Sequence, residues 1–182
     1  MSLINSTYSL FTNGSFKLNL QELDSDVLDS TCEHVEKDYL QRLMGDVMHL
    51  YYENNPIDAD YLELVNGYKV PTIEIDYVQQ YEFGVFIYAG KKCIYRGLKD
   101  MLAYFTYFHY IQGDYNFNPN LSEKINIAIT LSPEQNAFRA YNLGYKAYYD
   151  AYIFIKYKQS LGTGLFPDFV FDDIELINSF GI

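Results

Sequence analysis

A stripe of small residues on one predicted helix limits how this chain can pack. The segment 133–160 is PEQNAFRAYNLGYKAYYDAYIFIKYKQS, with a start signal at Ser132-Pro133 and a stop signal at Gly162. Its small residues recur at spacings of three and four: Ala137, Ala140, Gly144, Ala147 and Ala151. A helix face without large side chains lets a second helix approach closely. We therefore expect an antiparallel helix pair, with the helix 98–112 as the partner.

This partner helix carries two stripes of large side chains. One stripe is apolar: Leu98, Met101, Leu102, Phe105, Phe108 and Ile111. The other stripe consists of Tyr104, Tyr107 and Tyr110. The chain holds 20 tyrosines and 13 phenylalanines in 182 residues and no tryptophan, which is more ring surface than one helix pair can bury. We therefore expect the tyrosine stripe to face another subunit.

A third long helix is predicted over residues 25–53. Apolar side chains at spacings of three and four mark one buried stripe: Leu28, Cys32, Val35, Tyr39, Leu43, Val47 and Leu50. Gly45 interrupts the pattern, so we expect a kink there. Asn54-Asn55-Pro56 ends the helix, and a short helix over 58–67 follows and ends at a glycine.

Residues 69–96 alternate with period two and predict two or three antiparallel strands. Ile73, Ile75 and Tyr77 belong to the first run, and Ala89-Gly90-Lys91-Lys92 supplies a turn before the last strand. The expected fold class is therefore mainly α. It is a helical bundle with a small antiparallel β-hairpin or sheet insertion and with extended N- and C-terminal arms.

The expected organisation has three parts: an N-terminal arm over 1–24, a helical domain over 25–160 and a docking tail over 161–182. Asn and Ser residues mixed with apolar ones, and the turn signal Asn13-Gly14, predict a loop rather than a regular element in the arm. The tail is strongly apolar and contains four acids, Asp168, Asp172, Asp173 and Glu175. Such a tail docks either on its own domain or on a partner.

The net charge of −11, without a basic run, argues against direct nucleic-acid binding. The same charge disfavours binding to anionic membrane surfaces. DNA could only be a non-adhesive neighbour, which a negatively charged protein wall repels. No signal peptide and no apolar run of membrane-spanning length is present. Cys32 and Cys93 have no metal-type spacing and indicate buried thiols in a reducing compartment. We expect a protein made in a cytoplasm, with no membrane partner.

No catalytic, cofactor or metal motif stands out. His34, His49 and His109 share no metal-ligand spacing, and His109 is better explained as a core or interface residue than as a base. Gly162-Thr163-Gly164 lacks the lysine of a phosphate loop and indicates a hinge. Asp172-Asp173-Glu175 could attract a divalent cation, although an exposed acidic patch is the simpler interpretation. We expect neither an enzyme nor a cofactor-dependent protein.

Two blocks of the sequence resemble the head–tail connector (adaptor) proteins of tailed bacteriophages, especially those of crAss-like phages. The first block is EHVEKDYLQRLMGDVMHLYYE. The second is GLKDMLAYFTYFHYIQGD, followed after a connection by AFRAYNLGYKAYYDAYIFI and then FPDF. The likeness covers residues 25–160 and consists of hydrophobic patterns. The insertion 69–96 is larger than a minimal adaptor has.

The resemblance implies a virion protein of the neck, synthesised in the host cytoplasm. It implies a twelvefold ring below the portal protein that extends the DNA channel and docks further neck or tail proteins. Family members attach to the portal through a C-terminal segment, which implies Phe166, Phe169, Phe171 and Ile174 as anchors. The alternative is a soluble cytoplasmic helical domain that binds a ligand or regulates another protein.

Overall fold

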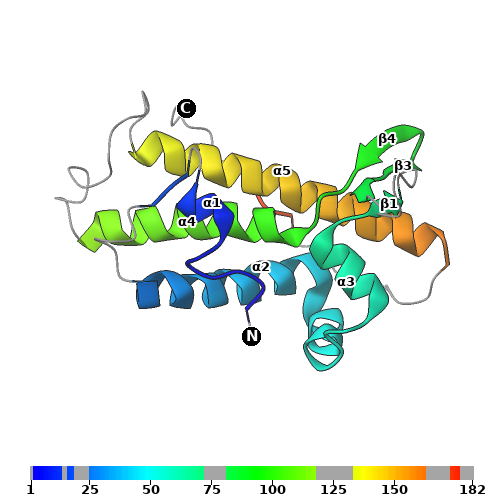
Figure 1. Ribbon diagram of the computed structural model, residues 1–182, viewed down its shortest axis with the longest axis horizontal. Coiled ribbons are helices and arrows are strands. Elements are labelled where there is room, and N and C mark those ends of the chain that lie inside the picture. Colours follow the sequence, from blue (N-terminus) through cyan, green and yellow to red (C-terminus); the bar gives the residue numbers. More distant parts are fainter. Residues whose placement is uncertain are drawn as a thin grey trace, which may run out of the picture. The chain divides into compact units, whose positions relative to one another are not determined.

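The computed structural model describes residues 2–13, 16–18, 25–71, 81–117, 133–162 and 173–176. The elements follow in the order α1 (Ser9–Thr12), α2 (Ser25–Asn54), α3 (Ala59–Asn66), β1 (Lys69–Pro71), β2 (Tyr81–Phe83), β3 (Val85–Tyr88), β4 (Lys91–Ile94), α4 (Leu98–Phe117) and α5 (Pro133–Ser160) (Figure 1). The fold is thus mainly α with a small antiparallel β insertion, as predicted. Within the described part of the chain, no helix combines the length and the apolar character that a bilayer span requires.

The chain divides into two compact units. Unit 1 comprises residues 1–39, 99–146 and 173–182, and unit 2 comprises residues 40–98 and 147–172. Both α2 and α5 contribute one part to each unit. The three-part organisation expected from the sequence stays a prediction.

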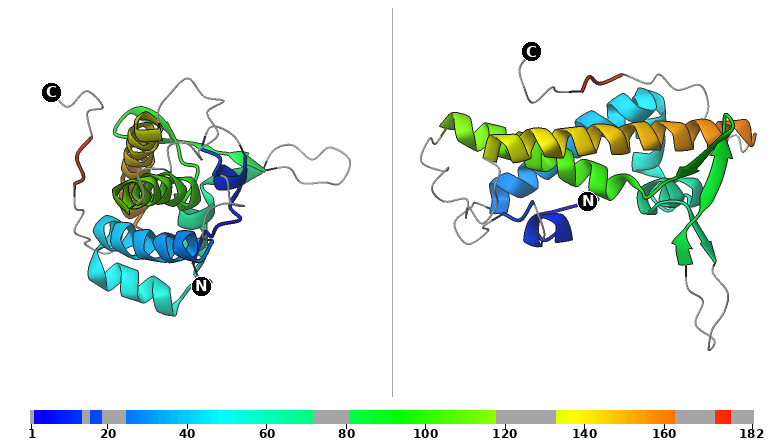
Figure 2. Two further views of the ribbon diagram at one scale, coloured as in Figure 1. Left: turned by 90° about the vertical axis from the view of Figure 1, so that its left-hand side faces the viewer. Right: turned by 90° about the horizontal axis from the view of Figure 1, so that it is seen from above.

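Unit 1 is built on parts of three helices. Seen end-on, its part of α4 lies between its parts of α2 and α5 (Figure 2). Each of the three helices contributes almost fully buried side chains to unit 1: Leu28, Cys32 and Val35 from α2, Met101, Leu102 and Phe105 from α4, and Ala137 and Ala140 from α5. The stripes predicted over these residues thus form the core of unit 1.

The N-terminal segment packs on unit 1 and contains a regular element that the sequence did not predict. Residues 9–12 form the short helix α1, and the Leu18 amide donates to the Phe11 carbonyl at 2.8 Å. Phe11, Phe16 and Leu18 are buried. The Ser6 amide also donates to the Asp29 carboxylate on α2, at 2.6 Å. The apolar side chains of the predicted N-terminal arm therefore form part of the core of unit 1.

Gly45 breaks α2, as predicted, and changes which side chains are buried after it. Its backbone is non-helical, with φ 74° and ψ 164°. The predicted stripe is buried up to Leu43, but Val47 and Leu50 are 80% and 59% exposed, so that part of the prediction is wrong. Met48 and Tyr52 are buried instead. The reason is that a non-helical residue rotates the next turns about the helix axis, so the buried face continues at other positions.

The short helix predicted over 58–67 is confirmed as α3, with a cap at each end. The Asp58 carboxylate accepts from the amides of Asp60 and Tyr61, at 2.9 and 3.2 Å. Gly67 ends the helix with φ 87°, and a Cβ at this position would lie 2.6 Å from the Arg96 carbonyl carbon. Glycine is therefore required at this position by both its dihedral angle and the close backbone.

The strands of unit 2 form two antiparallel pairs, β1–β2 and β3–β4. In the second pair Val85 lies opposite Ile94, and Tyr88 lies opposite Lys91. Positive φ angles at Ala89 and Gly90, 47° and 74°, are those of a two-residue turn that matches the strand twist. The residues Ile73, Ile75 and Tyr77 lie outside the described residues.

Helices α4 and α5 follow the predicted ranges, with one difference. Helix α4 continues through Gly113 to Phe117, whereas the sequence predicts a helix over 98–112. A single glycine weakens a helix by only about 1 kcal/mol relative to alanine, which does not by itself stop the helix. Helix α5 covers 133–160 as predicted, and Gly162 follows it with φ 68°.

A substitution at Gly45 tests the kink directly. Its φ and ψ fall in a region that is populated almost only by glycine. We expect Gly45→Ala to lower the free energy of unfolding by about 1–3 kcal/mol, measured by urea denaturation. Ser30→Ala, at an exposed helical position of the same helix, is the control and should change it by less than about 0.5 kcal/mol. Equal stabilities of the two variants would contradict the description of the kink.

Candidate interaction surfaces

The small-residue stripe of α5 lies against α4 within unit 1. Gly144 is buried, and a Cβ placed on it would come 2.9 Å from Cε1 of Phe105. Ala137 and Ala140 are buried on the same unit. The remaining members, Ala147 and Ala151, belong to unit 2, where Ala151 is buried and Ala147 is half-buried. The close approach expected from the sequence is therefore seen at Gly144.

We expect Gly144→Leu to overpack this contact. The added side chain would displace the Phe105 ring, so the free energy of unfolding should fall by about 1–3 kcal/mol. Lys146→Leu, which adds an apolar side chain at an exposed position of α5, serves as the control. Thermal unfolding followed by circular dichroism measures both variants. A melting temperature of Gly144→Leu equal to that of the control would show that Gly144 is not closely packed against Phe105.

The tyrosine stripe of α4 does not lie at the surface, which corrects its assignment as a subunit interface. Tyr107 and Tyr110 are 2% and 3% exposed, and Tyr104 is half-buried. The ring of Phe16 lies 5.5 Å from the ring of Tyr104 and 5.2 Å from that of Tyr107. Burial also raises the pKa of Tyr107 to about 12. The N-terminal segment covers the rings of Tyr104 and Tyr107, and no second subunit is needed to bury them.

Most other rings of the described residues also pack within their own unit. In unit 1 the Tyr39 and Phe105 rings stack at a centroid distance of 3.8 Å, and in unit 2 those of Tyr95 and Phe154 stack at 4.4 Å. The Tyr95 hydroxyl donates to the Leu64 carbonyl at 2.7 Å. In the described part, the exposed tyrosines and phenylalanines are Tyr51, Phe83 and Tyr149. Ring content alone therefore does not imply an interface.

The C-terminal tail is described only over residues 173–176. Ile174, one of the four predicted portal anchors, is buried in unit 1. For this residue the structure favours docking on its own chain over docking on a partner. The other three predicted anchors, Phe166, Phe169 and Phe171, lie outside the described residues, as does Asp172. Asp173 and Glu175 are exposed.

The histidines and cysteines are not brought together into a site. His109 Nε2 lies 3.1 Å from the Tyr39 hydroxyl, and His49 Nε2 lies 3.6 Å from the Glu53 carboxylate. Burial raises the pKa of the Cys32 thiol to about 12, so this cysteine is a poor nucleophile. Among the residues that the structure describes, no cluster of three or more His, Cys, Asp or Glu side chains could hold a metal ion.

A buried cation links α5 to α3 inside unit 2. The Lys158 ammonium lies 3.3 Å from the Asp60 carboxylate and also contacts the Glu63 carboxylate. Burial acts to lower the pKa of Lys158, but the hydrogen bonds and charges of Glu63 and Asp60 outweigh it and raise this pKa above its ordinary value. Asp60 and Glu63 are three residues apart and therefore lie on one face of α3. This spacing was a signal in the sequence for a cationic side chain that pairs with both acids.

Replacing Lys158 tests this link and its pH dependence. Lys158→Met should lower the free energy of unfolding at neutral pH by about 1.5–3 kcal/mol, the usual range for hydrogen bonds to charged groups. The pKa is raised in the folded state, so the contribution is complete below the unfolded pKa of about 10.4 and is lost as the pH rises above it. The stability difference between wild type and variant should therefore shrink at alkaline pH. Lys146→Met, at an exposed position of α5, is the control. A difference that does not change with pH would contradict the ionic link.

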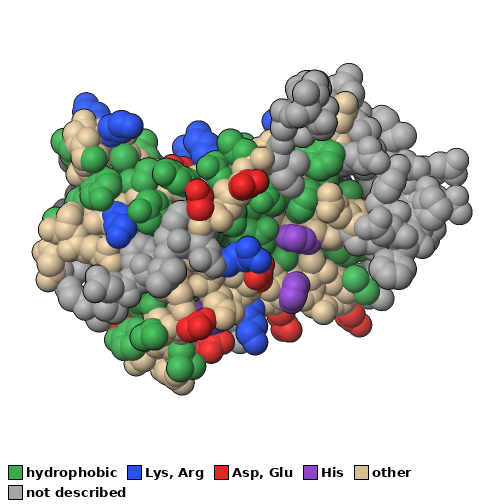
Figure 3. All heavy atoms as spheres, turned by 180° about the vertical axis from the view of Figure 1, so that it is seen from behind, with side chains coloured by type: hydrophobic (Ala, Val, Ile, Leu, Met, Phe, Trp, Pro, Cys, Tyr) green, Lys and Arg blue, Asp and Glu red, His purple; other side chains and the backbone are tan. Residues whose placement is uncertain are grey.

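Two groups of exposed apolar side chains lie on unit 2. The first, here called the corner, comprises Val47, Leu50, Tyr51 and Ile57, where α2 ends and α3 begins. Val47, Leu50 and Tyr51 share one helix face by their spacing, and Ile57 is 86% exposed. Figure 3 shows hydrophobic side chains gathered at the lower left, where this corner lies. The kink at Gly45 produces this group because it turns Val47 and Leu50 away from the core.

The second group, here called the hairpin face, comprises Val85, Ile87 and Ile94. All three are exposed and lie on one side of the β3–β4 pair, since Val85 opposes Ile94. The other side carries Phe86, which is buried 4.6 Å from the Tyr157 ring of α5. The run Val85-Phe86-Ile87 is apolar on both faces of a strand, which was a signal in the sequence for a hairpin covered on both sides. That signal was missed.

Comparison of the chain with protein-family models, curated proteins and solved structures found no match. Functional inference therefore depends on the geometry of the chain and on the sequence resemblance.

Proposed function

We propose that the chain is a structural protein of a bacteriophage neck. In this proposal identical copies form a ring below the portal protein, extend the DNA channel and dock further neck or tail proteins. The observation that carries the proposal is the presence of two exposed apolar groups, the corner and the hairpin face, on one unit. Grouped apolar side chains in water mark surfaces that bind other proteins. The site of action would be the virion, after synthesis in the host cytoplasm.

The order of the helices supports the resemblance on which the neck assignment depends. The first resembling block falls on α2 with its break at Gly45, and the second falls on α4 and α5. A twelvefold ring is the arrangement that the resemblance implies. The β insertion, which a minimal adaptor lacks at this size, carries the hairpin face and thus adds a contact surface.

The charge of the chain fits a channel wall. Each copy carries a net charge of −11, so a ring of copies repels the phosphate backbone of passing DNA. DNA would pass through without specific contacts. The proposal includes no catalytic residue, cofactor or metal ion.

The structure changes which residues the proposal assigns to which neighbour. The lateral contacts are assigned to the corner and the hairpin face, because Tyr107 and Tyr110 are buried within unit 1. Attachment to the portal remains proposed for the tail, through Phe166, Phe169 and Phe171. Ile174 is no longer an anchor in this proposal, since its side chain is buried on its own chain.

Purified phage particles test the proposed function. Mass spectrometry of particles that encode this chain should find it as a virion component in a fixed ratio to the portal protein. A variant that lacks residues 163–172 should keep its helical circular dichroism signal and be lost from particles. A matched variant with Phe166, Phe169 and Phe171 replaced by Ser keeps the length of the tail and should be lost as well.

The alternative, a cytoplasmic ligand-binding or regulatory domain, predicts a different result. In that case the chain would remain in the host cell lysate, be absent from particles and copurify with a small molecule. This outcome would overturn the neck assignment.

A further inference from the structure

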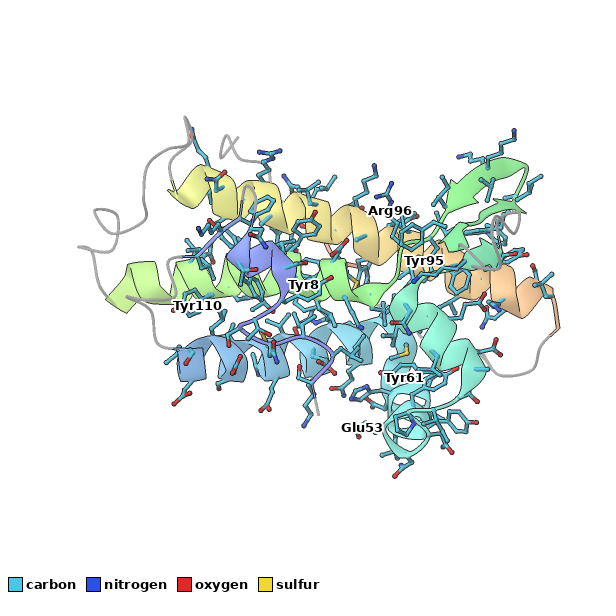
Figure 4. All side chains as sticks on the ribbon, in the orientation of Figure 1. Tyr8, Glu53, Tyr61, Tyr95, Arg96 and Tyr110 are labelled. Carbon is cyan, nitrogen blue, oxygen red and sulfur yellow. The ribbon has the colours of Figure 1, made fainter. Side chains whose placement is uncertain are left out.

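The corner of unit 2 is surrounded by acidic side chains. Residues 40–66 contain five acidic side chains and a single arginine. Two of these acids, Asp60 and Glu63, pair with Lys158, which leaves three for the surroundings of the corner. Glu53 lies at the end of α2 (Figure 4), and its side chain is 58% exposed. Asp46 is also exposed and precedes Val47 in the sequence. The Tyr51 hydroxyl lies 3.5 Å from the Asp58 carboxylate, which brings a third acid to the same group. The corner is therefore an apolar surface with a negative rim.

The hairpin face of the same unit is surrounded by basic side chains. Residues 81–98 contain Lys91, Lys92 and Arg96 against one acid, Glu82. The strand register places Lys92 opposite Ile87, on the exposed side that also carries Val85 and Ile94. Figure 3 shows blue Lys and Arg side chains above the hydrophobic side chains of this region, at the upper left.

Arg96 and one further basic residue, Lys69, lie at the base of the hairpin. Arg96 and Lys69 lie 5.8 and 5.7 Å from the centroid of the exposed Phe83 ring. Residues 81–98 thus carry more basic than acidic side chains, in a chain whose net charge is −11. The hairpin face is therefore an apolar surface with a positive rim, the counterpart of the corner.

We infer that the hairpin face of one copy binds the corner of a second copy. Each surface supplies apolar side chains for the centre of a contact and charges of opposite sign for its rim, which is the usual composition of protein interfaces. Two corners placed together would bring acids against acids, and two hairpins would bring lysines against lysines. Pairing of unlike surfaces is therefore favoured over pairing of like ones.

When the hairpin face of one copy binds the corner of another, each copy still has one of its two surfaces available for binding. A bound pair still has an unused corner at one end and an unused hairpin face at the other, so more copies can join in the same way. Such head-to-tail contacts give a closed ring when the rotation between copies closes, and a filament when it does not. This inference deepens the proposed function and relies on it for the closed ring alone. The association itself follows from the surfaces of unit 2.

Sedimentation velocity of the full-length chain at increasing concentration tests the inference. The wild type should associate, and Leu50→Asn in the corner or Ile87→Asn in the hairpin face should each weaken association by about tenfold or more. Both residues are exposed, so the two variants should keep the wild-type melting temperature. Val27→Asn, which removes an exposed apolar side chain of unit 1, is the control and should associate like the wild type. Val47→Asn and Ile94→Asn replace the two variants if either fails to fold.

Mixing the two variants distinguishes unlike from like pairing. The Leu50→Asn variant keeps an intact hairpin face and the Ile87→Asn variant keeps an intact corner, so an equimolar mixture should form a 1:1 dimer that grows no further. The inference is overturned if the wild type stays monomeric up to about 1 mM, where even weak complexes are populated. It is also overturned if either variant associates like the wild type, or if the mixture does not associate.

Sedimentation combined with the analysis of phage particles separates this inference from the proposed function. If the wild type associates through both surfaces but is absent from phage particles, the neck assignment fails and the inference stands. If the chain is present in particles but the wild type stays monomeric in sedimentation, or the Leu50→Asn and Ile87→Asn variants associate like it, the inference fails and the neck assignment stands.

Discussion

The backbone of Gly45 determines how the two parts of α2 bury their side chains. Up to Leu43 the apolar stripe follows a regular helix, and after the non-helical glycine it continues at Met48 and Tyr52. Because the buried positions change after Gly45, Val47 and Leu50 are exposed to solvent, close to the turn that leads into α3. The buried side of the second part is fixed by Tyr52, whose ring stacks on Tyr61 of α3 at 4.5 Å. One residue thus produces both the core of this region and its exposed corner.

Most aromatic side chains stabilise the inside of each unit, and the candidate contact surfaces consist of exposed aliphatic side chains and Tyr51. Ring pairs such as Tyr39 with Phe105 and Tyr95 with Phe154 lie within single units. Ring stacking adds to the free energy gained by burying the same area, so a small core gains more from rings than from aliphatic groups. A chain rich in tyrosine can therefore use most of its rings on itself.

Local signals in the sequence were sufficient for most of the fold. The helix ends at Asp58, Gly67 and Gly162 and the turn at Ala89-Gly90 depend on residues within a few positions, so their sequence patterns predict them. The break at Gly45 was predictable for the same reason. The dihedral angles of Gly45 could not be predicted from the sequence, and these angles determine which side chains are buried after the break.

The candidate surfaces were less predictable because they depend on contacts between distant segments. The sequence could not show that Phe16 covers Tyr104 and Tyr107, since that contact forms only in the folded unit. Nor could it show that Lys158 pairs with Asp60 and Glu63 of another helix. The hairpin face was in principle predictable from the apolar run Val85-Phe86-Ile87. The tyrosine stripe was misassigned because exposure was inferred from residue counts.

Methyl nuclear magnetic resonance of the wild-type chain over a dilution series shows whether the corner and the hairpin face bind each other. If they do, the methyl groups of Val47, Leu50, Val85, Ile87 and Ile94 should show concentration-dependent shifts or line broadening. The methyl groups of Val27 and Leu161, which are exposed elsewhere, should not respond. Spectra that do not change with concentration, or that change at Val27 and Leu161 instead, would contradict the claim that the corner and the hairpin face bind each other.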